Sequence, residues 1–155
     1  MIKVSNIVKR FGDLEVLHGV SLSVARGEIV SIVGASGAGK TTLLQIIGTL
    51  MKADGGEVLI DGVLPVGLSD AELSAFRNRH IGFVFQFHHL LEEFSALENV
   101  MLPMLIAGTD RTSAERRANE LLEMVAMRHR ATHRPSALSG GEQQRVAIAR
   151  ALANN

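Results

Sequence analysis

The stretch Gly34-Ala35-Ser36-Gly37-Ala38-Gly39-Lys40-Thr41-Thr42 decides the fold. Its glycines and its Lys-Thr pair match the spacing G-x-x-x-x-G-K-[ST]. Glycines let the backbone approach phosphate oxygens closely, and successive N–H groups at a helix start point toward such an anion. Lys40 adds a mobile cation for the outer phosphates, and the Thr41 hydroxyl is an oxygen ligand suited to Mg²⁺. The sequence therefore predicts a phosphate-binding loop.

The elements around this loop predict an α/β fold with a small antiparallel β region. The apolar run Glu28–Val33 precedes the loop and is typical of a strand buried on both faces. After the loop, apolar residues at helical spacing predict a helix: Leu43, Leu44, Ile46, Ile47 and Leu50. Runs rich in valine and isoleucine, bounded by turn residues, predict further strands at Ile2–Val8, Val16–Val24, Glu57–Ile60 and His80–Gln86.

A helical subdomain is predicted over residues 87–135, inserted in a single domain that covers residues 1–155. Upstream of it, Ser69-Asp70-Ala71-Glu72 is a capping box and predicts a short helix through Phe76. Within the insert, a helix is expected to begin after Thr112. Its apolar face is formed by Ala114, Ala118, Leu121, Leu122 and Val125. Pro135 ends the insert, and a last helix follows Ser139.

The amino-acid composition limits the classes of protein to which the chain can belong. The chain has 155 residues, of which 46% are hydrophobic and 21% are charged, which is typical of a globular domain. Its 16 basic residues balance 16 acidic ones, so the net charge does not favour nucleic acid, and we expect no such partner. The absence of cysteine excludes disulfides and thiolate metal sites. No segment is long and apolar enough to cross a bilayer, and we expect a cytoplasmic protein.

A second glycine motif lies near the end of the chain. Leu138-Ser139-Gly140-Gly141-Glu142 opens a helix and offers another anion-binding N-terminus, with the Ser139 hydroxyl as a further donor. Alone, such a motif is most often only a helix cap. Downstream of a phosphate loop, however, it resembles the ABC ATPase superfamily, in which L-S-G-G-Q or L-S-G-G-E is the signature motif. The resemblance covers the whole chain and implies a P-loop NTPase fold with an ABC-type nucleotide-binding domain.

This resemblance implies a composite ATP site. Family members form a head-to-tail homodimer with two ATP molecules between the copies. Each ATP contacts the phosphate loop of one copy and Ser139, Gly140 and Gly141 of the other. ATP closes the dimer and its hydrolysis opens it.

The resemblance also implies roles for single residues. Phe11 stands where the family has an aromatic residue that stacks on adenine, and Val16 lies beside the base. Gln86 stands where the family has its Q-loop glutamine. Lys40 and Gln86 are therefore expected to act in catalysis, and Thr41 and Gln86 to hold Mg²⁺.

The residues around the insert narrow the resemblance to one branch. Phe85-Gln86-Phe87-His88-His89-Leu90-Leu91 looks like the ATP-binding subunits of lipoprotein-releasing transporters, which drive lipoproteins out of the inner membrane of Gram-negative bacteria. One departure is Glu92, where that branch usually has proline. The branch implies integral membrane subunits that dock at Phe87–Gly108, and a location on the cytoplasmic face of the inner membrane.

Other functions remain open at this stage. The ATPases of macrolide exporters and of a cell-division complex share the same nucleotide contacts, so only the membrane partner separates them. A soluble ABC protein of translation or DNA repair is disfavoured because no second cassette or long coiled-coil insertion occurs here. A P-loop kinase is disfavoured by the motif Leu138–Glu142.

The hydrolytic residues of the family extend beyond the signature helix. They comprise an apolar strand that ends in aspartate, a catalytic glutamate and a histidine that contacts the γ-phosphate. The chain ends at Asn155 before any of them, so we expect the C-terminal third of the domain to be absent. Without its neighbours, Ile29–Val33 would have an uncovered edge. We therefore predict that the 155-residue chain is poorly stable and hydrolyses ATP slowly or not at all.

Two groups of histidines are candidates for a metal site. His129 and His133 have the spacing of two zinc ligands on a helix, but no acidic residue lies between them, which favours solvated histidines. His88, His89, Glu92 and Glu93 could chelate a metal, but we interpret them as a surface that faces a partner.

Overall fold

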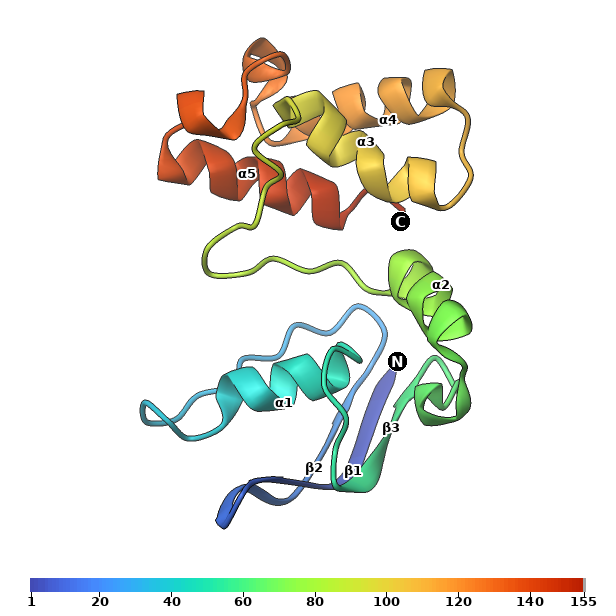
Figure 1. Cartoon of the computed structure of the whole chain (residues 1–155), viewed down its shortest axis with the longest axis vertical. Coiled ribbons are helices and arrows are strands. Elements are labelled where there is room, and N and C mark those ends of the chain that lie inside the picture. Colours follow the sequence, from blue (N-terminus) through green and yellow to red (C-terminus); the bar gives the residue numbers. More distant parts are fainter. Residues whose placement is uncertain (155) are drawn as a thin grey trace. The chain divides into compact units, whose positions relative to one another are not determined.

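The computed structural model describes residues 1–154, which form two compact units, Met1–Leu73 and the chain from Ser74 onward. The first unit holds three strands and one helix, β1 (Ile2–Phe11), β2 (Leu14–Val24), α1 (Lys40–Ile47) and β3 (Gly55–Ile60), followed by a 3-10 turn, η1 (Pro65–Gly67). Helix α2 (Asp70–His80) spans the boundary between the units. Figure 1 labels these helices and strands.

An antiparallel sheet of order β2-β1-β3 organises the first unit. The turn Gly12-Asp13 joins β1 to β2, and Gly12 takes the positive φ of +59° that this tight turn requires. Alternating apolar residues bury one face of the sheet, and helix α1 adds two buried residues of its own. The buried apolar residues of this region are Val4, Ile7, Leu17, Leu43, Ile46, Val58 and Ile60. The predicted antiparallel β region is confirmed.

Two predicted strands are wrong. Residues 28–33, before the phosphate loop, form no strand, and Ile29 and Val33 are 95% and 87% exposed. His80 ends α2, and residues 81–86 form no strand either. A strand buried on both faces is stable only when strands on its two sides satisfy its N–H and C=O groups. Within residues 1–154, the described sheet pairs only β1 with β2 and β3, and it offers these two segments no partner.

The second unit is a helical assembly of α3 (Ala96–Ile106), α4 (Arg111–Met124) and α5 (Gly140–Ala151), with the 3-10 turns η2 (Arg128–Arg130) and η3 (Pro135–Ala137). Apolar residues from all three helices share one core. They include Val100, Met101, Met104, Ala114, Ala118, Leu121, Leu122, Val146 and Ala149. Four of the five residues predicted to line the α4 face are buried as expected. The boundaries 87–135 of a helical subdomain stay a prediction, and α5 packs in the same core as α3 and α4.

Helix starts in this unit follow the side chains that cap them. α3 begins after Ser95, whose hydroxyl and Glu98 form a capping box. α4 begins at Arg111, earlier than predicted, because Asp110 is its N-cap and its carboxylate accepts a hydrogen bond from Ser113 N at 3.0 Å. An aspartate at this position also interacts favourably with the helix dipole, which explains why it displaces Thr112 from the cap. Among residues 1–154, none of the helices has the length and hydropathy that spanning a membrane requires.

Candidate functional site

The phosphate loop turns sharply into helix α1. Gly37 and Gly39 adopt left-handed φ angles of +80° and +81°, which residues with a Cβ rarely adopt. Gly39 is the N-cap of α1 and, having no side chain, forms no side-chain cap. The N–H groups of the first turn, on Lys40, Thr41 and Thr42, therefore keep their hydrogens for a ligand. This arrangement suits the phosphate groups of a nucleotide.

The loop is seated directly on strand β2. A Cβ built on Gly39 would lie 2.8 Å from Leu17 Cδ2 and 2.9 Å from Val16 Cγ1. The fold thus brings Val16 beside the phosphate loop, although the two are more than twenty positions apart in sequence. Phe11 ends β1 with 49% of its surface exposed and with Lys9 Nζ 5.6 Å from its ring centroid. A residue exposed to this extent is accessible to a stacking ligand.

The Lys40 side chain bonds to carbonyl groups of its own loop. Its ammonium group donates hydrogen bonds to Gly34 O at 2.8 Å and to Ala35 O at 2.6 Å. An ammonium group has three hydrogens, so one remains for a phosphate oxygen. Thr41 is exposed at the start of α1.

The signature motif forms a capped helix start in the second unit. Ser139 is the N-cap of α5. Its hydroxyl oxygen accepts a hydrogen bond from Glu142 N at 3.4 Å, and Glu142 Oε2 accepts a hydrogen bond from Ser139 N at 2.8 Å. Ser139, Gly140 and Gly141 are all exposed. The Ser139 side chain also bonds the Glu142 carboxylate, so its hydroxyl is engaged within the motif. The motif is thus a capped and exposed helix start.

Glu142 carries the strongest electrostatic perturbation at this helix start. The hydrogen bonds from the Ser139 backbone and side chain, and then from Arg130, lower the pKa of Glu142 from its ordinary value of 4.5 to about 2. Gln143 supports the same turn, since its Nε2 donates to Pro135 O at 3.0 Å and to Leu138 O at 3.2 Å. The turn that presents Ser139 is therefore held by side chains on both sides.

Arg150 is a residue that the sequence analysis missed. Its guanidinium donates to His89 O at 2.6 Å and to His88 O at 2.7 Å, and His88 and His89 have positive φ angles of +57° and +47°, respectively. Arg150 thus fixes the chain that follows Gln86, which itself lies in an exposed turn. No short sequence motif predicts this contact, because Arg150 and His89 are 61 positions apart in the sequence.

The candidate metal groups do not assemble. Among residues 1–154, no three histidine, aspartate or glutamate side chains come together in a way that could hold a metal ion. His133 is half-buried and bonded to Arg130 at 3.0 Å, so the expectation of a solvated side chain is wrong for this residue. His129 is exposed as expected.

Residues 17–155 match the family described as ABC transporter. Over its full length the chain is 59% identical to the lipoprotein-releasing system ATP-binding protein LolD of Bacteroides thetaiotaomicron, of which it covers 71%. It is 55% identical to the LolD protein of Geobacter metallireducens, with 98% of this chain and 69% of that protein aligned.

Solved structures of the ATP-binding cassette MJ0796 have the same fold. One of them is a dimeric post-hydrolysis state bound to ADP and Pi. It superposes on this chain with a TM-score of 0.92 at 45% sequence identity, and the match covers 100% of this chain and 70% of that chain. A second, described as a dimeric bacterial ABC transporter cassette, has the same TM-score at 46% identity and the same coverage. The predicted fold class is confirmed.

Proposed function

We propose, because the chain belongs to the ABC transporter family of ATPases, that it is the ATP-binding subunit of a system that releases lipoproteins from the inner membrane. The observation that carries this proposal is the name shared by seven curated relatives that are 51–59% identical to the chain. Each is a lipoprotein-releasing system ATP-binding protein, and each aligns with 98–100% of this chain.

Nucleotide binding starts at the phosphate loop. The N–H groups at the start of α1 and the ammonium of Lys40 bind the phosphates of ATP, while Phe11 and Val16 contact adenine. The seating of Gly39 on Val16 supports this assignment because it places the base-contacting residue and the loop on one rigid support. Thr41 and Gln86 would hold Mg²⁺, which neutralises part of the phosphate charge when bound. The exposed Thr41 hydroxyl fits a hard cation, which prefers oxygen ligands.

The second half of the site comes from another copy of the chain. Ser139, Gly140 and Gly141 of one copy contact the ATP held by the phosphate loop of the other. The exposure of these three residues at a capped helix start supports the assignment, as does the dimeric state of the MJ0796 structures. ATP then favours the closed dimer and hydrolysis favours the open state, because only ATP bridges both copies.

Integral membrane subunits dock at residues Phe87–Gly108, on the cytoplasmic face of the inner membrane. Two large apolar side chains there are mostly exposed, Phe87 at 78% and Ile106 at 68%, and the same segment also exposes Glu92 and Glu93. Exposed apolar groups rimmed by charges are typical of protein interfaces. Charge reversal at Glu92 and Glu93 should reduce binding to the membrane subunits, whereas reversal at the exposed Glu123 of α4 should not. Equal binding by all these variants would contradict this docking site.

The experiment for the whole proposal compares Lys40→Ala with Lys52→Ala, a change at an exposed lysine outside the loop. ATP affinity is measured with a fluorescent ATP analogue, and lipoprotein release is measured in vesicles that contain the membrane subunits. Lys40→Ala should weaken nucleotide binding about 100-fold and stop release, since it removes a charged contact to phosphate. Lys52→Ala should change neither. Binding of the chain to the membrane subunits of an exporter or of a cell-division complex, but not to those of a lipoprotein-releasing system, would favour that alternative instead.

A further inference from the structure

We propose that Arg130 is a positioning residue for the signature motif, holding Glu142 so that Ser139 keeps the orientation in which it contacts the ATP of a second copy. This inference rests on the composite site proposed above. Nothing in the motif itself requires Arg130, which lies nine positions before Ser139, in the 3-10 turn η2.

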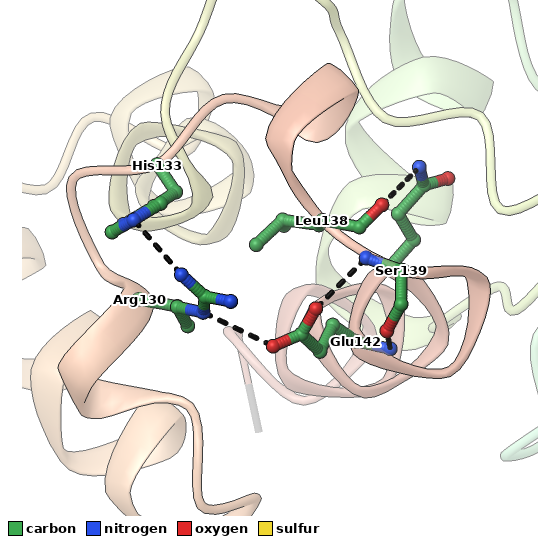
Figure 2. Close-up of polar contacts among 6 residues, drawn as sticks. Arg130, His133, Leu138, Ser139 and Glu142 are labelled. Carbon is green, nitrogen blue, oxygen red and sulfur yellow. Dashed lines mark hydrogen bonds and ion pairs between the residues drawn. The ribbon is translucent and has the colours of Figure 1, made fainter.

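The carboxylate of Glu142 binds both Ser139 and Arg130. Its Oε2 accepts from Ser139 N at 2.8 Å, and its Oε1 accepts from Arg130 Nε at 3.1 Å. Figure 2 shows Arg130 between His133 and Glu142, with the carboxylate directed at the backbone of Ser139. Because each oxygen has its own donor, Arg130 restricts rotation of the carboxylate without competing for the oxygen that binds Ser139. The Glu142 side chain is only 16% exposed, so water competes weakly for this ion pair.

Arg130 is itself held from the opposite side. Its Nη1 lies 3.0 Å from His133 Nε2. A guanidinium group can only donate, so His133 Nε2 is the acceptor of this bond. The backbone of this segment is bonded to the first turn of α3, through Ala96 N to His133 O at 2.8 Å and Leu97 N to Ala131 O at 2.9 Å.

These contacts form a continuous path from α3 to the signature motif. It runs from the first turn of α3 through residues 131–133 to Arg130, then through Glu142 to Ser139. Helix α3 lies within the proposed docking region of residues 87–108, so Arg130 links that region to the group that contacts ATP. A surface arginine that only solvated the turn would need neither the shared carboxylate nor the bond to His133.

The first experiment measures amide hydrogen exchange of Ser139 in the chain without nucleotide. Loss of the Arg130 contact leaves the Glu142 carboxylate free to rotate, so Arg130→Gln should make the Ser139 amide exchange about tenfold faster. Arg128→Gln is the matched control, because Arg128 lies in the same turn but is exposed. Arg130→Lys should recover part of the protection. Unchanged exchange in Arg130→Gln would overturn the proposal.

The second experiment measures dimerisation by analytical ultracentrifugation with ATP and Mg²⁺. Arg130→Gln should raise the dimer dissociation constant about tenfold, while ATP binding to the phosphate loop of the monomer stays at the wild-type value. In the background of Glu142→Gln, Arg130→Gln should have no further effect, because the charged partner is gone. An undiminished effect in that background would show that Arg130 acts elsewhere and overturn the proposal.

The two experiments separate this proposal from the one on which it rests. If the wild-type chain stays monomeric with ATP and Mg²⁺, the composite site is wrong, and so is the role of Arg130 in an ATP contact. If the wild type dimerises and Arg130→Gln dimerises equally well, the composite site stands and only the positioning role is wrong.

Discussion

The contact between Gly39 and strand β2 provides a quantitative test of how the phosphate loop is built. The perturbation is Gly39→Ala, and the matched control is Gly37→Ala in the same loop. Both glycines have nearly identical left-handed φ angles, +81° and +80°. Their surroundings differ, because a Cβ on Gly37 meets no heavy atom within 4 Å, whereas a Cβ on Gly39 lies 2.8 Å from Leu17 Cδ2 and 3.2 Å from Val16 O.

The two substitutions share one energetic cost and differ in another. A left-handed backbone costs a residue with a Cβ about 1–2 kcal/mol, and this applies to both. The crowding at Gly39 adds about 1–3 kcal/mol, because Leu17 is only 4% exposed and the Val16 carbonyl belongs to a paired strand. We expect Gly39→Ala to lower the free energy of unfolding by about 2–5 kcal/mol and Gly37→Ala by about 1–2 kcal/mol.

The assay is urea denaturation of the nucleotide-free chain followed by far-UV circular dichroism. Amide exchange of β1 and β2 is measured in parallel, because it reports on the first unit alone. Working without ATP removes any effect of the lost glycine on ligand contacts. Equal destabilisation by the two substitutions would refute the reasoning, since it would mean that the loop does not rest on Val16 and Leu17.

Three further predictions concern the second unit. The ionised carboxylate of Glu142, which caps α5, stabilises the folded chain above pH 4.5. This stabilisation is lost as the pH falls through the folded pKa of Glu142, about 2. An NMR titration of the Glu142 carboxyl with a midpoint near 4.5 would contradict this prediction. Asn99→Ala should cost at least about 3 kcal/mol in the same denaturation assay, because the buried amide nitrogen lies within hydrogen-bond distance of three carbonyl oxygens before α3 and the amide oxygen accepts from Leu91 N. Arg150→Met should lower the free energy of unfolding by about 2 kcal/mol and make residues 86–91 sensitive to proteolysis, because the carbonyl groups of His88 and His89 lose their donor. Resistance to proteolysis equal to that of the wild type would show that other contacts hold this segment.

The features that the sequence predicted well are local ones. The phosphate loop, the signature helix and the apolar face of α4 follow from glycine conformation, capping chemistry and the 3.6-residue period, all of which act within a few positions along the chain. The β1–β2 hairpin follows from a Gly-Asp turn between two apolar strands in the same way. The two strands predicted at residues 28–33 and 80–86 failed because a parallel strand depends on neighbours that are distant in sequence.

The sequence by itself predicted the glycine loop that leads into α1 and the glycine motif that begins α5. Only the tertiary structure decided what holds these pieces in place. Val16 and Leu17 support Gly39, Arg130 restrains the carboxylate that caps Ser139, and Arg150 binds the backbone after Gln86. Side chains at such separations are brought together by packing of whole elements, and no periodicity or spacing in the sequence encodes that packing directly.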